Sequence, residues 1–133
     1  MNSYNLSVRV YYEDTDAGGV VYHTGYIRFF ERARTEWLRA LGFSQARLAE
    51  EVGVLFTVVD LTIRFLKPAR LDDLLQVSAS TDDRRGASLT FVQQIRNAAG
   101  ELLAEGNVRV ACVDARTMKP RRLPADLLAR MGA

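Results

Sequence analysis

The spacing of apolar residues changes along the chain from an alternating pattern to a helical one and back again. In residues 6–10, apolar and polar side chains alternate, which is typical of a half-buried strand. Further on, apolar residues recur three or four positions apart, as on one face of a helix. These residues are Tyr26, Phe30, Ala33, Trp37 and Leu41. We therefore predict an amphipathic helix over about residues 25–41, with Thr24 as its N-cap and Gly42 at its left-handed C-terminal position.

Beyond this helix the pattern predicts a short helix, several strands and a terminal helix. Ser44 is a suitable N-cap for a helix of about residues 45–51. Turn-forming residues such as those at 82–86 separate runs that are rich in β-branched and aromatic residues, which indicates hairpins. The predicted strands are 54–65, 75–81, 87–97 and 102–113. Pro124 begins a predicted helix within residues 123–131.

One long helix followed by consecutive strands excludes a βαβ alternation and indicates the α+β class, with an antiparallel meander. A five-stranded sheet curled around the long helix is the simplest way to bury both elements. The 133 residues, 48% of them hydrophobic, suffice for a single domain, residues 1–133. One helix covers only one sheet face, however, and Val54, Phe56 and Val58 still need a partner. We therefore predict that subunits pair.

Composition and charge exclude several classes of protein. The net charge of +2 is too small to indicate general nucleic-acid binding. The sequence contains no run of about 18 or more apolar residues, so no integral membrane segment is predicted. The single cysteine, Cys112, excludes an internal disulfide, and the N-terminus lacks a signal-peptide pattern, so we expect a cytoplasmic protein. The sequence has no zinc-type Cys and His spacing, phosphate-binding loop or serine-nucleophile motif. We therefore expect neither a metal nor a redox cofactor.

The chemistry that the residues suggest lies directly before the long helix. An acidic turn, residues 13–16, is followed by Gly18 and Gly19, and Asp16 comes seven residues before His23. A helix start offers unpaired N–H donors with a partial positive charge. If the loop folds back, Asp16 would face a carbonyl group whose oxygen these donors hold, an arrangement suited to hydrolysis of an activated acyl group. The alternative is that the acids are solvated turn residues.

Residues 12–36, YEDTDAGGVVYHTGYIRFFERARTE, resemble the signature of hotdog-fold acyl-CoA thioesterases of the 4-hydroxybenzoyl-CoA thioesterase type. The likeness is strongest to the subfamily associated with the Tol-Pal system of Gram-negative bacteria. It continues through residues 68–73, 86–91 and 112–124, and so covers nearly the whole chain. The resemblance implies a hotdog fold and a homodimer or homotetramer with active sites at the subunit interface.

The resemblance also implies roles for two residues of the signature. Asp16 would attack the thioester carbonyl or activate a water molecule to do so, and both roles stay open. The backbone N–H of His23 would hold the oxyanion. Its imidazole is a candidate for orienting water or assisting the leaving group. Because the aryl-CoA relatives carry Tyr-Pro in place of His23 and Thr24, such a role would belong to the Tol-Pal-associated branch alone.

Two further residues near the signature have alternative interpretations. Tyr12 is a candidate hydrogen-bonding partner in the site, or else a packing aromatic. Glu31 is a candidate because another hotdog branch uses a helix-borne glutamate as its catalytic carboxylate. The alternative for Glu31 is a solvated or ion-paired helix residue.

Coenzyme A carries phosphates that basic side chains should meet at an exposed edge. Arg84 and Arg85 match a basic run that holds the nucleotide end in the aryl-CoA relatives, although Gly86 replaces its third residue. Arg64 and Lys67, at a strand end, are the other candidates. The alternative is that these side chains are simply solvated.

We therefore interpret the protein as an acyl-CoA thioesterase that acts on short- to medium-chain acyl-CoA, with aryl-CoA as the second choice, and releases free acid and CoA. The alternative is a binding module for acyl groups or acyl carrier protein in envelope or phospholipid metabolism, with incidental hydrolysis. In that case a basic surface including Arg121 and Arg122 would receive the acidic carrier protein.

Overall fold

The computed structural model of the protein describes residues 2–132. Its elements are β1 (Ser3–Arg9), a 3-10 turn η1 (Tyr12–Asp14), α1 (His23–Ala40), α2 (Gln45–Arg47), a π-helical turn η2 (Leu48–Val52), β2 (Val54–Phe65), β3 (Leu74–Arg85), β4 (Ser88–Arg96), β5 (Leu102–Asp114) and α3 (Ala125–Arg130). One long helix and five strands make up most of the chain, which confirms the predicted α+β class. None of the helices in this range is long and apolar enough to span a membrane.

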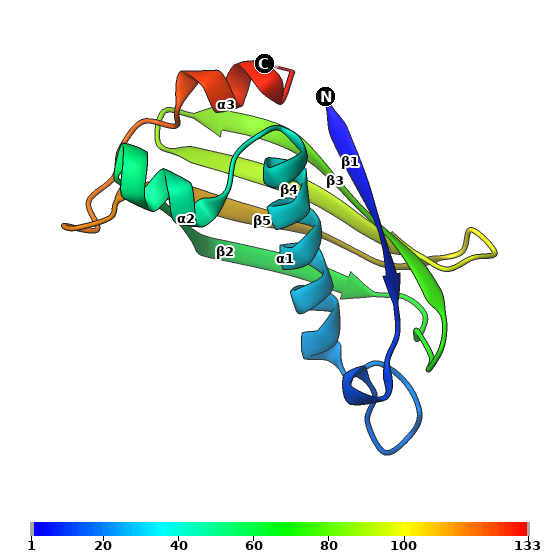
Figure 1. Cartoon of the computed structure of the whole chain (residues 1–133). Helices are drawn as coiled ribbons and strands as arrows, with labels where there is room; N and C mark the ends of the chain where they lie inside the picture. The colour runs from blue at the N-terminus through cyan, green and yellow to red at the C-terminus, as the bar shows by residue number, and fades with distance from the viewer. Residues whose placement is uncertain (1, 133) are drawn as a thin grey trace.

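The five strands pair antiparallel in the order β1-β3-β4-β5-β2, and α1 lies across one face of the sheet (Figure 1). The predicted five-stranded sheet around a central helix is therefore confirmed. The expected meander, however, covers only β3, β4 and β5. β2 lies at the far edge beside β5, so the connection to β3 crosses the width of the sheet. Alternation of side chains shows which face of a strand is buried, but not which strand lies next to it.

α1 packs closely on the sheet around Gly106 of β5. A Cβ atom here would lie 2.5 Å from the Thr62 carbonyl oxygen and 3.0 Å from Cε2 of Phe30, so only glycine fits. On the adjacent strand, Gln93 is fully buried, and its Nε2 donates to the Phe30 carbonyl oxygen of α1 at 3.0 Å. A buried amide is stable only when it is hydrogen-bonded. These contacts fix the position of α1 along the sheet.

The start of α1 differs from the prediction. The helix begins at His23, and Thr24 lies inside its first turn rather than capping it. Tyr22 occupies the N-cap position, and its side chain makes no capping hydrogen bond. The loop is anchored by other contacts, so the chain does not need a side-chain cap here. The first N–H groups of the helix are consequently left without this usual partner.

The hairpin between β3 and β4 is tighter than the sequence predicts. β3 continues to Arg85, and the turn narrows from residues 82–86 to Gly86 and Ala87. A register shift between Asp82 and Arg84 accommodates the added length. Charged turn-forming residues can extend a strand where their side chains face solvent, which a propensity argument does not capture.

Other local predictions are confirmed. The Oγ atom of Ser44 accepts a hydrogen bond from the N–H of Arg47 at 3.2 Å, as an N-cap does. Gly42 has a φ of +93°, the left-handed conformation that ends many helices. β2 occupies the predicted residues 54–65, whereas α3 is shorter than the predicted terminal helix.

β2 forms an apolar edge of the sheet. Val54 is buried, but Val58 and Val59 are 49% and 53% exposed, and a β-bulge lies between Val58 and Asp60. Phe65, at the end of the strand, is about half exposed. An edge strand carries unpaired backbone groups, and apolar residues make it a surface for pairing. The predicted need for a further partner therefore applies to the middle and end of β2, including Val58, and not to Val54, which is buried, or Phe56, which packs against the core.

Candidate active site

The acidic loop before α1 is held in place by Asp14. This side chain is buried, and its Oδ2 accepts a hydrogen bond from the Tyr11 N–H at 2.8 Å. Its Oδ1 lies 3.7 Å from Nη2 of Arg28 on α1. The Tyr22 N–H in turn donates to the Asp14 carbonyl oxygen at 3.2 Å. Asp14 therefore acts as the anchor that joins the loop to the helix.

Asp16 lies in a tight turn beyond this anchor. Its N–H donates to the Val20 carbonyl oxygen at 2.9 Å, and its Oδ1 accepts from the Gly18 N–H at 2.8 Å. Gly19 has a φ of +78°, which a residue with a side chain rarely adopts. Unlike Asp14, Asp16 is exposed. The turn thus fixes one carboxylate oxygen and presents the side chain to solvent.

The loop is also tied to the connection between β2 and β3. The Val21 N–H donates to the Ala69 carbonyl oxygen at 2.8 Å, and the Ala69 N–H donates to the Tyr26 hydroxyl oxygen at 2.9 Å. Gly25 makes this approach possible, since a Cβ atom there would lie 2.7 Å from Cγ1 of Val21. The Asp16 turn, the start of α1 and the Ala69 segment consequently form one unit.

The start of α1 offers free hydrogen-bond donors. The Gly25 N–H donates to the Tyr22 carbonyl oxygen at 2.7 Å, but the N–H groups of His23 and Thr24 meet no acceptor within residues 2–132. The His23 ring packs on Tyr22, with centroids 4.1 Å apart, and lies edge-on to Phe65 at 6.2 Å. Unpaired donors at a helix N-terminus attract negative charge. This end of α1 can therefore stabilise a developing oxyanion.

A hollow opens beside these donors, with about 540 Å³ of empty space that includes open solvent. Its lining joins the helix start to the end of β2 and the following loop. The lining residues are Val21, His23, Tyr26, Phe65, Leu66, Lys67 and Pro68. The wall therefore combines apolar side chains with an imidazole, a phenol and one ammonium group, a mixture that is typical of small-molecule sites.

Tyr26 connects this hollow to Asp16 electrostatically. Its ring is buried and packs edge-on against Phe65 with centroids 5.3 Å apart. Burial raises the pKa of Tyr26, the hydrogen bond from Ala69 opposes this rise, and the negative charges of Asp16 and Asp73 add to it. The phenol therefore stays neutral at pH 7.

The predicted site residues fall into separate groups. The loop that contains Asp16 lies at the N-terminal end of α1 (Figure 1), and His23 is the first residue of that helix. Tyr12 is 83% exposed, so it is not a packing aromatic within one chain. Glu31 is exposed on the outer face of α1 between Arg28 and Arg32, outside the lining of the hollow, which favours the solvated interpretation.

The predicted CoA contacts are not gathered at this site within one chain. Lys67 lines the hollow but pairs with Glu101, and Arg64 pairs with Glu105 at 3.2 Å. β3 starts near the Asp16 turn and runs away from it, which places Arg84 and Arg85 roughly 35 Å along the strand at about 3.3 Å per residue. The pair of arginines therefore lies at the opposite end of the sheet.

The sequence predicts only two of the seven residues that line the hollow, His23 and Lys67, as site residues. It places Tyr26 on the apolar face of the helix and Phe65 in a strand, and both placements are right but incomplete. A tyrosine on an apolar helix face was the available signal, because a buried hydroxyl needs a hydrogen-bond partner. That partner, Ala69, is 43 residues away in the sequence and has no motif of its own.

Comparison with known proteins identifies the class. The model of the thioesterase-like superfamily matches residues 10–131. The acyl-CoA thioester hydrolase YbgC of Escherichia coli O6:H1 is 54% identical over 122 residues, which cover 92% of this chain and 90% of that protein. The acyl-CoA thioesterase YbgC of Haemophilus influenzae is 49% identical over 129 residues, covering 96% and 93% of the two chains.

Solved structures agree with this class. A probable thioesterase from Bartonella henselae has a TM-score of 0.87 at 38% identity, covering 92% of this chain and 99% of that chain. The 1,4-dihydroxy-2-naphthoyl-CoA thioesterase Slr0204 from Synechocystis has a TM-score of 0.91 at 23% identity, covering 98% and 96%, and supports the fold alone. The chain belongs to the thioesterase-like superfamily. The expected hotdog-fold thioesterase is thereby confirmed.

Proposed function

We propose that this thioesterase hydrolyses short- to medium-chain acyl-CoA to a free acid and CoA, using Asp16 and the N-terminal end of α1. The observation that carries the proposal is the exposed Asp16 carboxylate beside a helix start whose His23 and Thr24 N–H groups have no acceptor in the described chain. The apolar wall of the adjacent hollow suits an acyl group. The named activities of the curated relatives support the reaction class.

Two routes lead from this arrangement to the products. With Asp16 as base, the carboxylate takes a proton from water, the oxygen of that water bonds to the carbonyl carbon, and the C–S bond breaks to release CoA. With Asp16 as nucleophile, its oxygen bonds to the carbon, CoA leaves, and water then hydrolyses the mixed anhydride. The departing thiolate takes a proton in both routes. In both, the carbonyl oxygen becomes negative and is held by the helix-start N–H groups.

Secondary roles are proposed for His23 and Tyr12. The His23 imidazole lies between Tyr22 and Phe65 at the rim of the hollow, where it can orient water or assist the leaving thiolate. Tyr12 precedes the Asp16 turn and is almost fully exposed, so its hydroxyl is available to a substrate or to a second subunit.

We assign the CoA phosphates first to Lys67, since its ammonium lies at the hollow. Glu101, its partner, has a lowered pKa because of hydrogen bonds from Lys67 and Asn97, so it stays ionised and would compete with the phosphates. Arg64 is the neighbouring candidate. Arg84 and Arg85 would serve the site of another subunit, because they lie far from Asp16 in their own chain.

Pairing with a second copy through β2 is part of this proposal, as a homodimer or homotetramer. A two-fold axis would bring the same exposed segment of both chains together, including Val58, Val59 and Phe65. Because Phe65 borders the hollow, such a pair would also narrow the site. Light scattering should give at least twice the mass of 14.9 kDa, and a stable monomer at micromolar concentration would contradict the pairing.

The binding-module alternative is less favoured. Arg121, one of the two arginines assigned to a carrier-protein surface, is already engaged. Its Nη1 donates to the Gly53 carbonyl oxygen at 2.9 Å and lies 3.5 Å from the Asp114 carboxylate. The association with acyl carrier protein, the link to the Tol-Pal system and the cytoplasmic location stay predictions.

Thiol release from a panel of CoA thioesters tests the proposed function. The panel contains acetyl-, butyryl-, hexanoyl-, palmitoyl- and 4-hydroxybenzoyl-CoA, with an Asp16→Asn variant assayed beside the wild type. We expect turnover to peak on the short- and medium-chain members and to collapse in the variant. Negligible release from every member would contradict the proposal, and a maximum on 4-hydroxybenzoyl-CoA would favour the aryl-CoA choice.

A further inference from the structure

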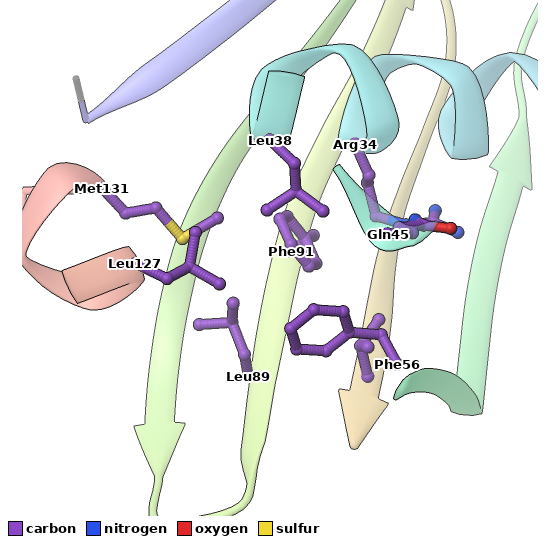
Figure 2. Close-up of a pocket in the computed structure, with 9 residues that line it drawn as sticks. Arg34, Leu38, Gln45, Phe56, Leu89, Phe91, Leu127 and Met131 are labelled. Atoms are coloured by element: carbon purple, nitrogen blue, oxygen red, sulfur yellow. The ribbon is translucent and has the colours of Figure 1, made fainter. Parts of the chain in front are cut away.

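A second hollow lies at the other end of α1, between the helix, the sheet and α3 (Figure 2). It encloses about 360 Å³ of empty space, part of which is open solvent. Seven apolar side chains form most of its wall. They are Leu38, Phe56, Leu89, Phe91, Val110, Leu127 and Met131. The hollow is therefore an apolar one, bounded by three different layers of the fold.

One cationic side chain, that of Arg34, is part of this largely apolar wall. Arg34 of α1 points into the hollow toward Gln45 (Figure 2). Its guanidinium lies over the Phe91 ring, 5.9 Å from the centroid, and its Nη1 donates to Oε1 of Gln93 at 3.0 Å. Gln93 is itself held by the Phe30 carbonyl oxygen. The charged group is thus fixed in place by a neutral amide and an aromatic face.

The positive charge of Arg34 has no carboxylate partner among the residues that the structure describes. A guanidinium has five N–H donors, and a single hydrogen bond to a protein acceptor is seen for this one. Burial lowers the pKa of Arg34, while the charge of Glu31 opposes that shift without forming an ion pair. Partly buried cations are usually paired, so this side chain retains capacity for an anion.

We propose that this hollow binds a short aliphatic carboxylate, with its chain among the apolar side chains and its carboxylate on Arg34. The planar guanidinium fork matches the two oxygens of a carboxylate. Apart from the Gln45 amide, the rest of the wall offers apolar contacts, which favour an aliphatic chain over a more polar anion. The free acid released by thioester hydrolysis has this chemistry, so the physiological identity of the ligand rests on the proposed function.

The site is separate from the catalytic hollow. Arg34 follows His23 by 11 residues on the same helix, which corresponds to roughly 16 Å at a rise of 1.5 Å per residue. The two hollows share no lining residue. A short chain fits better than a long one because the space is narrow. Met131, with its unbranched and adaptable side chain, can adjust to the chain length.

Calorimetric titration with sodium hexanoate tests the inference. The wild type should bind hexanoate saturably, and Arg34→Gln should weaken binding at least about tenfold, as expected for loss of a charge-assisted hydrogen bond. The matched control is Arg32→Gln, which removes the same charge from the exposed face of the same helix and should leave the affinity within about twofold. Hexan-1-ol should bind more weakly, and equally to the wild type and Arg34→Gln.

Further arms separate this inference from the proposed function. Asp16→Asn should bind hexanoate like the wild type, because the two hollows are distinct. Equal affinity in Arg34→Gln, loss of binding in Asp16→Asn, or no saturable binding to the wild type would overturn the inference. If the wild type does not bind hexanoate and Arg34→Gln differs from the wild type in molar mass, the inference would also be overturned. The hollow would then be assigned to contact with a second copy of the chain. Inactivity toward every CoA thioester with intact hexanoate binding would overturn the proposed function alone.

Discussion

The two ends of α1 differ in how their backbone groups are satisfied. At the C-terminal end, the Phe43 N–H donates to the Leu38 carbonyl oxygen at 2.9 Å, and Nη1 of Arg130 donates to that of Leu41 at 2.7 Å. At the N-terminal end, the N–H groups of His23 and Thr24 have no acceptor within residues 2–132. The chain therefore closes one end of its longest helix with its own residues and leaves the other end open.

The surfaces beside the two ends of α1 also differ. The N-terminal end faces an open hollow with an exposed carboxylate nearby, whereas the C-terminal half of the helix faces a narrow apolar hollow with a fixed cation. A helix N-terminus favours negative charge and so suits a transient oxyanion. Arg34 instead offers a permanent full charge, which suits a stable anion. The comparison suggests that the open end performs chemistry and the closed end performs binding.

The largest expected effect is that of Asp16→Asn at the open end. Asparagine keeps the shape and the acceptor for the Gly18 N–H, but it can neither take a proton nor attack efficiently. Turnover should fall at least about a hundredfold, with the unfolding free energy unchanged within about 0.5 kcal/mol. The control is Glu13→Gln, which neutralises an exposed acid of the same loop and should keep nearly full turnover. An active Asp16→Asn enzyme would remove the distinction between the two ends.

A smaller effect is expected from Gly25→Ala in the first turn of α1. The added Cβ atom would meet Cγ1 of Val21 at 2.7 Å, and a buried, β-branched valine cannot turn away easily. The overlap should cost about 1–3 kcal/mol against a helix-propensity gain of up to about 1 kcal/mol. The displaced helix start should lower turnover roughly tenfold. Adding Val21→Ala should restore much of the activity, and no restoration would mean that the contact is not the cause.

Tyr26→Phe tests the link between the Asp16 turn and the rest of the chain. The variant leaves the Ala69 N–H without its acceptor, which should lower the unfolding free energy by about 1–2 kcal/mol and turnover a few-fold. The pKa of Tyr26 is raised in the folded state above its ordinary value of 10.0. The unfolded chain therefore loses this proton first, so the stabilisation by Tyr26 is present below pH 10 and is lost as pH rises through the folded pKa. The difference in unfolding free energy between the wild type and Tyr26→Phe should therefore be smaller above pH 10 than at pH 7.

Local patterns explain why much of this comparison was predictable from the sequence. The helix spacing, the Gly42 terminus and the Asp16-to-His23 separation all depend on residues within one turn or one loop. Asp16 and His23 lie seven positions apart, so a single turn suffices to bring them together. The position of the candidate site could therefore be predicted from the sequence without knowledge of the fold.

Contacts between distant segments explain what the sequence could not provide. The hydrogen bond between Tyr26 and Ala69 joins two segments that carry no common motif. The edge position of β2 decides that Phe65 borders the site, and a strand pattern does not determine the order of strands. The same limit applies to Arg34, whose hydrogen-bond partner Gln93 lies on β4, 59 residues away in the sequence.

The smallest expected effect is that of Ser44→Ala, at the closed end. Ser44 follows the C-terminus of α1 and caps α2, and loss of this cap should lower the unfolding free energy by about 1 kcal/mol. This cost is close to that of Tyr26→Phe, yet Ser44 does not line the hollow beside His23, so turnover should stay within about 20% of the wild type. Thermal unfolding and thiol release measured on both variants separate stability from catalysis. If Ser44→Ala lost as much turnover as Tyr26→Phe, general loosening of the fold would explain both results, and the open end would have no special role.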